Sequence, residues 1–235
     1  MERMEFDRFE CMSFDCYGTL IDWETGILEA LRPVLAAHGV RADDERLLEM
    51  YGAAESEVQA GPYRPYRAVL RDVLAKLGGQ LGFTTTVEQS DAFTVSVRDW
   101  PSFADSRAAL RALGKRFRLI ILSNIDDDLF EFSRQRLDVT FDRIFTAQQI
   151  GSYKPSPGNF EHLVAHAGVP RDRLLHVAQS LYHDIGPARD AGLATVWVNR
   201  RHDREGSGAT PRATGAVPDL TVPDLQTLAA LSGAN

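Results

Sequence analysis

Long apolar runs are missing from this sequence of 235 residues. No stretch approaches the ~20 consecutive apolar residues that a helix needs to cross a bilayer. The acidic start, residues 1–10, also lacks the basic and then apolar pattern of a secretory signal. We therefore expect a cytoplasmic protein that has no membrane partner.

Cysteine is scarce, and basic residues are outnumbered by acidic ones. Cys11 and Cys16 lie in or just past one predicted strand, where five residues at ~3.3 Å each hold them beyond the ~7 Å limit of a disulfide, so we expect reduced thiols. The 26 Lys and Arg residues against 33 Asp and Glu residues give a net charge of −7. This charge repels phosphate backbones, so nucleic acid is not an expected partner.

The remaining composition is that of an ordinary folded protein. Hydrophobic residues make up 44% and charged residues 25%, close to the average of globular chains. Apolar runs of strand length are found at 11–14, 118–122, 143–145, 174–178 and 194–198, and a segment of helical spacing precedes each of the last four, at 104–113, 127–137, 157–167 and 183–191. This alternation predicts βαβ units and an α/β fold with a Rossmann-like parallel sheet.

The first predicted strand is separated from the second by about a hundred residues, far more than a normal crossover. Helical patterns fill this interval at 27–37, 45–58, 67–77 and 87–97. We therefore predict a helical cap over residues 23–99, inserted into a core made of residues 1–22 and 100–235. The stretch 206–215 predicts a mobile surface loop before a short final helix at 224–231.

Polar side chains follow four of the predicted strands. In Phe14-Asp15-Cys16-Tyr17-Gly18-Thr19-Leu20, a carboxylate comes directly after a buried strand and is followed by a turn glycine and a hydroxyl. Ser123, Asn124, Lys154 and Asp184 follow three other strands. Each of them alone is explained by helix capping or by a solvated charge. Together they indicate one site, because parallel sheets bind ligands at the carboxyl edge.

These motifs resemble, in order and around a cap insertion, those of the haloacid dehalogenase superfamily. The first motif is most similar to that of the 2-haloacid dehalogenase branch. The resemblance implies that Asp15 is the nucleophile, that Lys154 is its charge partner and that Asp184 is the last acidic residue. It also assigns substrate binding to the Ser123-Asn124 pair and to two residues of the first motif, Tyr17 and Thr19. An ammonium within ~4 to 6 Å suits a nucleophilic carboxylate, because it favours the ionised form.

Two positions depart from the pattern of the magnesium-dependent phosphatases in this superfamily. Those enzymes resemble one another in a second aspartate two residues after the nucleophile, where this chain has Tyr17. A phenol of pKa ~10 is a poor acid near neutrality. They also carry Gly-Asp-Ser where this chain has Ala178-Gln179-Ser180, although Mg²⁺ prefers carboxylate and water oxygens. We therefore expect neither a metal nor another cofactor.

The cap matches the dehalogenases less well than the core does. Their early cap carries an arginine that helps to hold the halide, and only Arg46 lies near the matching place. Arg64 and Arg67 could supply this cation, or they could be solvated residues at a helix start. The position of the last aspartate is also open, because a gap-free match to the dehalogenases selects His183 and the phosphatase spacing selects Asp184.

The sequence thus predicts a metal-independent hydrolase of small 2-haloalkanoic acids. Asp15 would attack C2 of a small carboxylate substrate, halide would leave, and water would hydrolyse the aspartyl ester. Two alternatives remain: a magnesium-dependent phosphatase of a small metabolite, and a degenerate family member that only binds a ligand. The oligomeric state is open, with a homodimer as one arrangement.

Overall fold

The computed structural model describes residues 4–201, 204, 206–213 and 215–234. Its centre is one sheet of six parallel strands in the order β3-β2-β1-β4-β5-β6. Five strands are those that the sequence predicts, so the α/β fold with a Rossmann-like parallel sheet is confirmed. The strands are β1 Cys11–Phe14, β2 Arg118–Ser123, β3 Arg143–Thr146, β4 Leu174–Ala178, β5 Ala194–Val198 and β6 Leu220–Val222.

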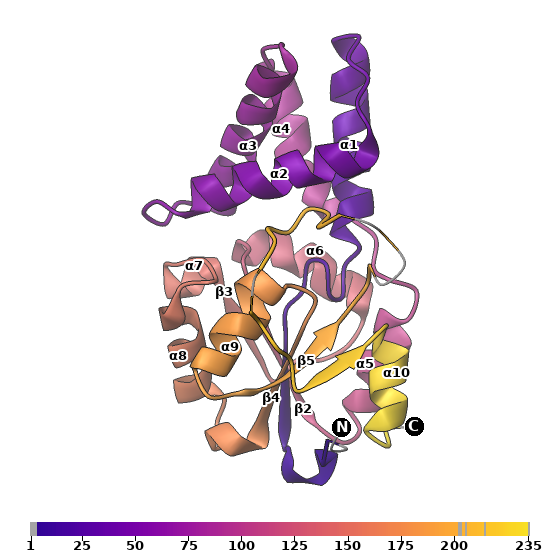
Figure 1. Ribbon diagram of the computed structural model, residues 1–235, viewed down its shortest axis with the longest axis vertical. Helices are drawn as coiled ribbons and strands as arrows, with labels where there is room; N and C mark the ends of the chain where they lie inside the picture. The colour runs from indigo at the N-terminus through magenta and orange to yellow at the C-terminus, as the bar shows by residue number, and fades with distance from the viewer. Residues whose placement is uncertain (1–3, 202–203, 205, 214, 235) are drawn as a thin grey trace.

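Helices cover both faces of the sheet (Figure 1). One face packs against α8 (Pro157–His166) and α9 (Gly186–Asp190) through side chains such as Cys11 and Ile120. The other face packs against α5 (Ser106–Leu113), α6 (Asp127–Leu137) and α10 (Leu225–Leu231). Because both faces are buried, β1 and β4 are apolar along most of their length.

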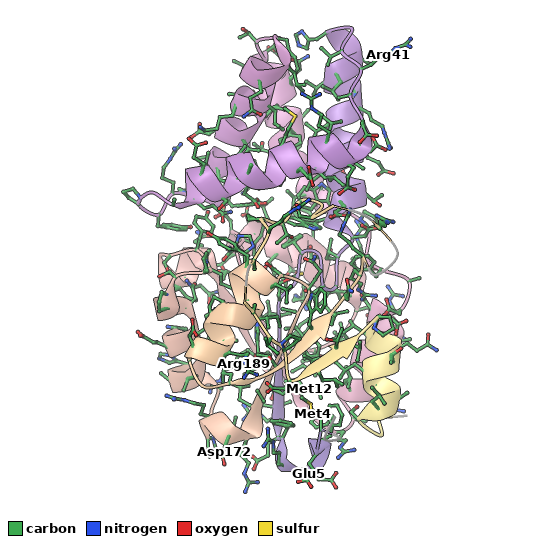
Figure 2. The ribbon with its side chains drawn as sticks, in the orientation of Figure 1. Met4, Glu5, Met12, Arg41, Asp172 and Arg189 are labelled. Carbon is green, nitrogen blue, oxygen red and sulfur yellow. The ribbon has the colours of Figure 1, made fainter. Side chains whose placement is uncertain are left out.

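Four helices form a separate layer beyond the carboxyl ends of the strands (Figure 1). They are α1 Trp23–Ala37, α2 Asp44–Gln59, α3 Tyr66–Leu81 and α4 Val87–Val95, followed by the 3₁₀ turn η2 Ser96–Asp99. The helix α2 lies across the side of this layer that is nearest to the sheet. Figure 2 shows Arg41 at the outer end of the layer and Asp172 at the opposite end of the molecule. We call this layer the cap.

The two chain segments that connect the cap to the core run next to each other. Ile21 forms an antiparallel bridge with Ser102, and the N–H of Asp22 donates to the carbonyl of Pro101 at 2.8 Å. Asp22 also begins α1, because its side chain accepts from the N–H of Thr25. The division into core and cap at residues 22–23 and 99–100 stays a prediction. The bridge and the hydrogen bond described above lie next to these two positions.

The segment after β5 differs from the prediction of a mobile surface loop. Gly208, Ala209 and Thr210 are buried, and the N–H of Ala209 donates to Glu24 Oε1 in α1 at 3.1 Å. A Cβ atom on Gly52 of α2 would lie 2.5 Å from the carbonyl oxygen of Ala209, so the loop and α2 touch through backbone. The prediction is wrong for 208–210, because these residues pack against the cap. Residue 214 of the predicted loop lies outside the described residues.

The remaining shorter elements are two one-turn helices, a small helix and a π-helical turn: η1 Phe6–Arg8, η3 Arg171–Arg173, α7 Ala147–Ile150 and η4 Leu181–Ile185. Both cysteines are buried and free, as expected, and burial raises the pKa of the Cys11 thiol to about 12. Within the described part of the chain, no helix is long and apolar enough to span a membrane.

Candidate active site

The predicted catalytic side chains meet at the carboxyl edge of the sheet. Asp15 follows β1, Ser123 ends β2, and Asp184 lies in η4 after β4. After β1 the chain turns sharply at Gly18, whose φ of 92° favours glycine. The N–H groups of Leu20 and Ile21 then donate back to the carbonyl of Cys16 at 2.7 and 3.0 Å. This turn fixes Asp15 and Thr19 beside one another.

The Lys154 ammonium bridges the two buried carboxylates. Its Nζ donates to Asp15 Oδ1 at 2.9 Å, to Asp184 Oδ1 at 2.7 Å and to the carbonyl of Leu122 at 3.0 Å. The lysine side chain is 2% exposed, and those of Asp15 and Asp184 are 8% and 1% exposed. With so little water near them, the three charges interact far more strongly than a surface ion pair does.

Thr19 holds the second oxygen of Asp15. Its hydroxyl donates to Asp15 Oδ2 at 2.6 Å and accepts from the N–H of Gln179 at 2.9 Å. Both carboxylate oxygens of Asp15 therefore have a donor before any substrate arrives. In the structure Thr19 positions Asp15, and its predicted contact with substrate stays a prediction.

A buried histidine supports Asp184 from inside the sheet. His176, in the centre of β4, donates from Nε2 to Asp184 Oδ1 at 3.0 Å, and its Nδ1 faces Ser13 Oγ at 2.9 Å. Asp184 Oδ2 has no hydrogen-bond partner among the described residues, although it is buried. This leaves one oxygen of Asp184 available to a water molecule or a substrate in the site.

Burial and charge act in opposite directions on the two carboxylates. Burial raises the pKa of Asp15 above its ordinary value, while the Lys154 ammonium and the Thr19 hydroxyl act to lower it. Burial also acts to raise the pKa of Asp184, but Lys154 and His176 hold it below its ordinary value. The two carboxylates in turn raise the pKa of Lys154 against the effect of burial, so the lysine stays charged.

The carboxylates face a narrow pocket between the core and the cap. Its free volume is about 30 Å³, on the order of the room that one or two water molecules need. The core contributes the residues described above together with Gln179, Ser180 and Thr210. The cap contributes Trp23, Glu55, Gln59 and Tyr66.

Ser123, Asn124 and Tyr17 all line this pocket, but their polar groups are used differently. Ser123 Oγ is buried without a hydrogen-bond partner among the described residues, and its predicted contact with a substrate stays a prediction. The Asn124 side chain instead holds the backbone of Lys154, with bonds of 2.7 Å from its N–H and 3.0 Å to its carbonyl. The Tyr17 hydroxyl lies 2.9 Å from Ser133 Oγ in α6, and burial raises its pKa well above the ordinary value.

The structure does not bring Arg64 and Arg67 into the pocket. Arg64 pairs with Asp72 at 2.6 Å and is half exposed, and Arg67 pairs with Asp128 at 2.7 Å. The prediction that they bind substrate is therefore not supported by their position. They lie at and before the start of α3, where a guanidinium reaches water and surface carboxylates more easily than the buried site.

His183 and Asp184, the two candidates for the last acidic position, have different contacts. Asp184 contacts Lys154, whereas the Nδ1 of His183 lies 3.2 Å from Ser180 Oγ. Burial lowers the pKa of His183 to about 4, so this ring is neutral near pH 7. The phosphatase spacing therefore selects the residue that completes the charged cluster.

The donor set at this site does not fit Mg²⁺. Across the part of the chain that the structure describes, no three His, Cys, Asp or Glu side chains are gathered as a metal site. The Lys154 ammonium already lies within hydrogen-bond distance of both carboxylates. Mg²⁺ needs an octahedral shell of oxygen ligands, and the two positions that carry carboxylates in the phosphatases are Tyr17 and Gln179 here.

Four residues in or beside the site were not predicted from the sequence: His176, Glu55, Trp23 and Thr210. A histidine inside an apolar strand gives no distinct pattern. Glu55 left a signal, because it follows Tyr51 by four residues on the same buried face of α2 as Leu47 and Leu48. A carboxylate on such a face is unusual and indicates a function or a paired charge.

The fold and the site together define a hydrolase built on a Rossmann-like core with a helical cap, and comparison with known proteins assigns it to a family. The model of the haloacid dehalogenase-like hydrolases matches residues 9–192. The chain therefore belongs to the haloacid dehalogenase-like hydrolase family, and the resemblance seen in the sequence motifs is confirmed.

Similar proteins include both phosphatases and dehalogenases. A phosphoserine phosphatase of Thermus thermophilus is 30% identical to this chain. The match covers 71% of this chain and 64% of the length of that phosphatase. The (S)-2-haloacid dehalogenase H-109 of Pseudomonas putida is 26% identical over 92% of this chain and 94% of its own. The structure of L-2-haloacid dehalogenase from Xanthobacter autotrophicus has a TM-score of 0.79 at 21% identity, over 95% of this chain and 98% of that one.

Proposed function

We propose that this hydrolase acts without a metal on small 2-haloalkanoic acids, through an ester formed on Asp15. The observation that carries the proposal is the position of Lys154, which bridges Asp15 and Asp184 at 2.9 and 2.7 Å. A buried ammonium in this place offsets the charge of the nucleophile and of an anionic substrate. The free hydroxyl of Ser123 is available to bind the substrate carboxylate.

In the first step an oxygen of Asp15 forms a bond to C2, and the carbon–halogen bond breaks. The halogen leaves with the bonding electrons as halide. In the second step water attacks the carbonyl carbon of the ester, and the bond from that carbon to the ester oxygen breaks. The 2-hydroxy acid leaves with the oxygen that Asp15 supplied; one proton of the water goes to that oxygen and the other to solvent, which restores the Asp15 carboxylate. Asp184, whose Oδ2 has no partner among the described residues, orients this water.

Halide needs no proton when it leaves, which agrees with a tyrosine, rather than an aspartate, two residues after Asp15. The Tyr17 hydroxyl faces Ser133 and has a raised pKa, so it is a poor donor for a departing alkoxide. An alkoxide leaving from a phosphate ester would need such a donor. Tyr17 therefore favours carbon–halogen cleavage over the hydrolysis of a phosphate ester.

A magnesium-dependent phosphatase is the second candidate, because one curated relative at 30% identity is a phosphoserine phosphatase. The donor set described above argues against it. Halide and phosphate release should be measured on panels of 2-haloacids and small phosphate esters, with and without chelator. We expect halide release that a chelator does not change, and chelator-sensitive phosphate release would favour the phosphatase.

The covalent step is tested by one turnover in ¹⁸O-water. If Asp15 attacks carbon, the heavy oxygen enters the Asp15 side chain, and the first product keeps an old oxygen. Mass spectrometry of the peptide that contains Asp15 measures this, and Asp15→Asn should release no halide. A labelled hydroxy acid with an unlabelled Asp15 would show direct attack of water on C2 instead.

A further inference from the structure

The cap places a carboxylate in the pocket, opposite the charged cluster of the core. Glu55 in α2 is 4% exposed and lines the same cavity as Asp15 and Lys154. Its Oε1 accepts from the Tyr66 hydroxyl at 2.6 Å and from the Tyr51 hydroxyl at 3.0 Å. Two donors on one oxygen fix the direction of the carboxylate.

Glu55 has no cationic partner in the part of the chain that the structure describes. Among the described residues, neither an ion pair with Glu55 nor a hydrogen bond to its Oε2 is present, and none of the residues that line the pocket is an arginine. Its described lining holds three carboxylates, those of Asp15, Glu55 and Asp184, and one ammonium, that of Lys154, which pairs with the two core aspartates. A substrate that carries only negative charge therefore meets a cap that repels it once Glu55 is ionised.

We propose that Glu55 is a specificity-determining residue that binds a positively charged nitrogen of the substrate. The inference rests on the proposed function and narrows its substrate class. The substrate would be a small zwitterion, whose carboxylate faces Ser123 and whose ammonium faces Glu55, with the leaving group on the carbon next to Asp15. The ammonium would supply the cation that a buried carboxylate requires.

The geometry favours this role over a structural one. A carboxylate that only closed the hydrogen bonds of two tyrosines would have no need to line the cavity, and an amide or a water molecule would serve as well. Glu55 also cannot form a halide site, since a halide and a carboxylate repel each other. Burial raises the pKa of Glu55 to about 7, while the two tyrosine hydroxyls act to lower it, so a nearby ammonium can shift the group to its ionised form.

Binding of inert ligands tests the inference without any turnover. Calorimetry should compare 3-aminopropionate with propionate, and 4-aminobutyrate with butyrate, on the wild-type chain. At least one amino acid should bind about tenfold more tightly than the matching acid without an amino group, and Glu55→Gln should abolish this preference. Glu57→Gln is the matched control, because Glu57 lies on the same helix and pairs with Lys76 at the surface.

The inference would be overturned by equal or tighter binding of the plain acids, by no binding of either amino acid, or by a preference that survives in Glu55→Gln. Equal losses for both ligand types in Glu55→Gln would also overturn it, because they would show a structural role.

Turnover separates this inference from the proposed function. Halide release should be compared for 3-amino-2-chloropropionate and 2-chloropropionate. The kcat/KM for the amino compound, divided by that for 2-chloropropionate, should be lower in Glu55→Gln than in the wild type. If neither compound loses halide but the binding preference is found, the proposed function fails and the role of Glu55 stands. If both compounds release halide equally in the wild type and the variant, the proposed function stands and the role of Glu55 fails.

Discussion

The free energy of unfolding of Glu55→Gln, relative to that of the wild type, should increase as the pH rises. Burial raises the pKa of Glu55 from 4.5 to about 7. At 1.36 kcal/mol for each pKa unit, this rise corresponds to about 3 kcal/mol. Because Glu55 is almost fully buried, solvent screening reduces this figure little. Gln keeps an oxygen that accepts from Tyr51 and Tyr66, so the packing of α2 is preserved.

The sign follows from proton linkage. The unfolded chain loses the Glu55 proton near its ordinary pKa, whereas the folded chain keeps it until about pH 7. The stabilising contribution is complete below the unfolded pKa, and it is lost as the pH rises through the folded pKa. The difference in unfolding free energy between wild type and Glu55→Gln should thus change by about 2 to 3 kcal/mol between about pH 5 and pH 8.

Urea denaturation at several pH values measures this difference, and thermal unfolding should show it as a relative shift of about 5 to 10 °C. Glu57→Gln serves again as control, since the Glu57 side chain is 69% exposed, and its difference from wild type should not vary in this way. A Glu55→Gln difference that stays constant with pH would refute the reasoning. It would mean that Glu55 is already ionised in the folded protein and that water reaches it freely.

Four other substitutions test the core of the site and the surface beside it. Lys154→Ala leaves two buried carboxylates without their cation, so it should cost about 3 to 5 kcal/mol in urea denaturation. Its residual halide release should rise with pH, because the pKa of Asp15 increases further. Thr19→Val removes a donor from Asp15 and should cost about 1 to 3 kcal/mol of stability, with a lower kcat. Arg64→Ala and Arg67→Ala should leave steady-state kinetics unchanged, and an increased KM in either variant would contradict their surface position.

The parallel sheet could be predicted from sequence because its central strands are buried on both faces. Such strands form continuous apolar runs, as in Leu174–Ala178, and these stand out between polar helices. The last strand, Leu220–Val222, was missed because it has three residues at the sheet edge and only Val222 is buried. The loop at 208–210 was misjudged for a related reason. Its burial depends on the distant helix α2, and no local pattern records that contact.

The reactive part of the site could be predicted for a topological reason. Parallel strands bring their carboxyl ends to one edge, so polar residues just after them must lie together, as Asp15, Lys154 and Asp184 do. No such rule relates the cap to the core. Glu55 reaches the pocket only because of how α2 packs across it, and Arg64 turns to the surface although it lies nearby in sequence.

This difference separates two parts of the function. The core residues determine which bond is attacked, and they follow from a fold that many hydrolases share. In the proposed function the cap residues determine which molecule is held over Asp15, and here they include the buried carboxylate of Glu55. A bound ammonium would favour the ionised form of Glu55, and ionised Glu55 would in turn bind the ammonium more tightly. Ligand charge and the protonation of Glu55 are therefore coupled, so affinity for an amino acid should rise through about pH 7 while affinity for a plain acid falls.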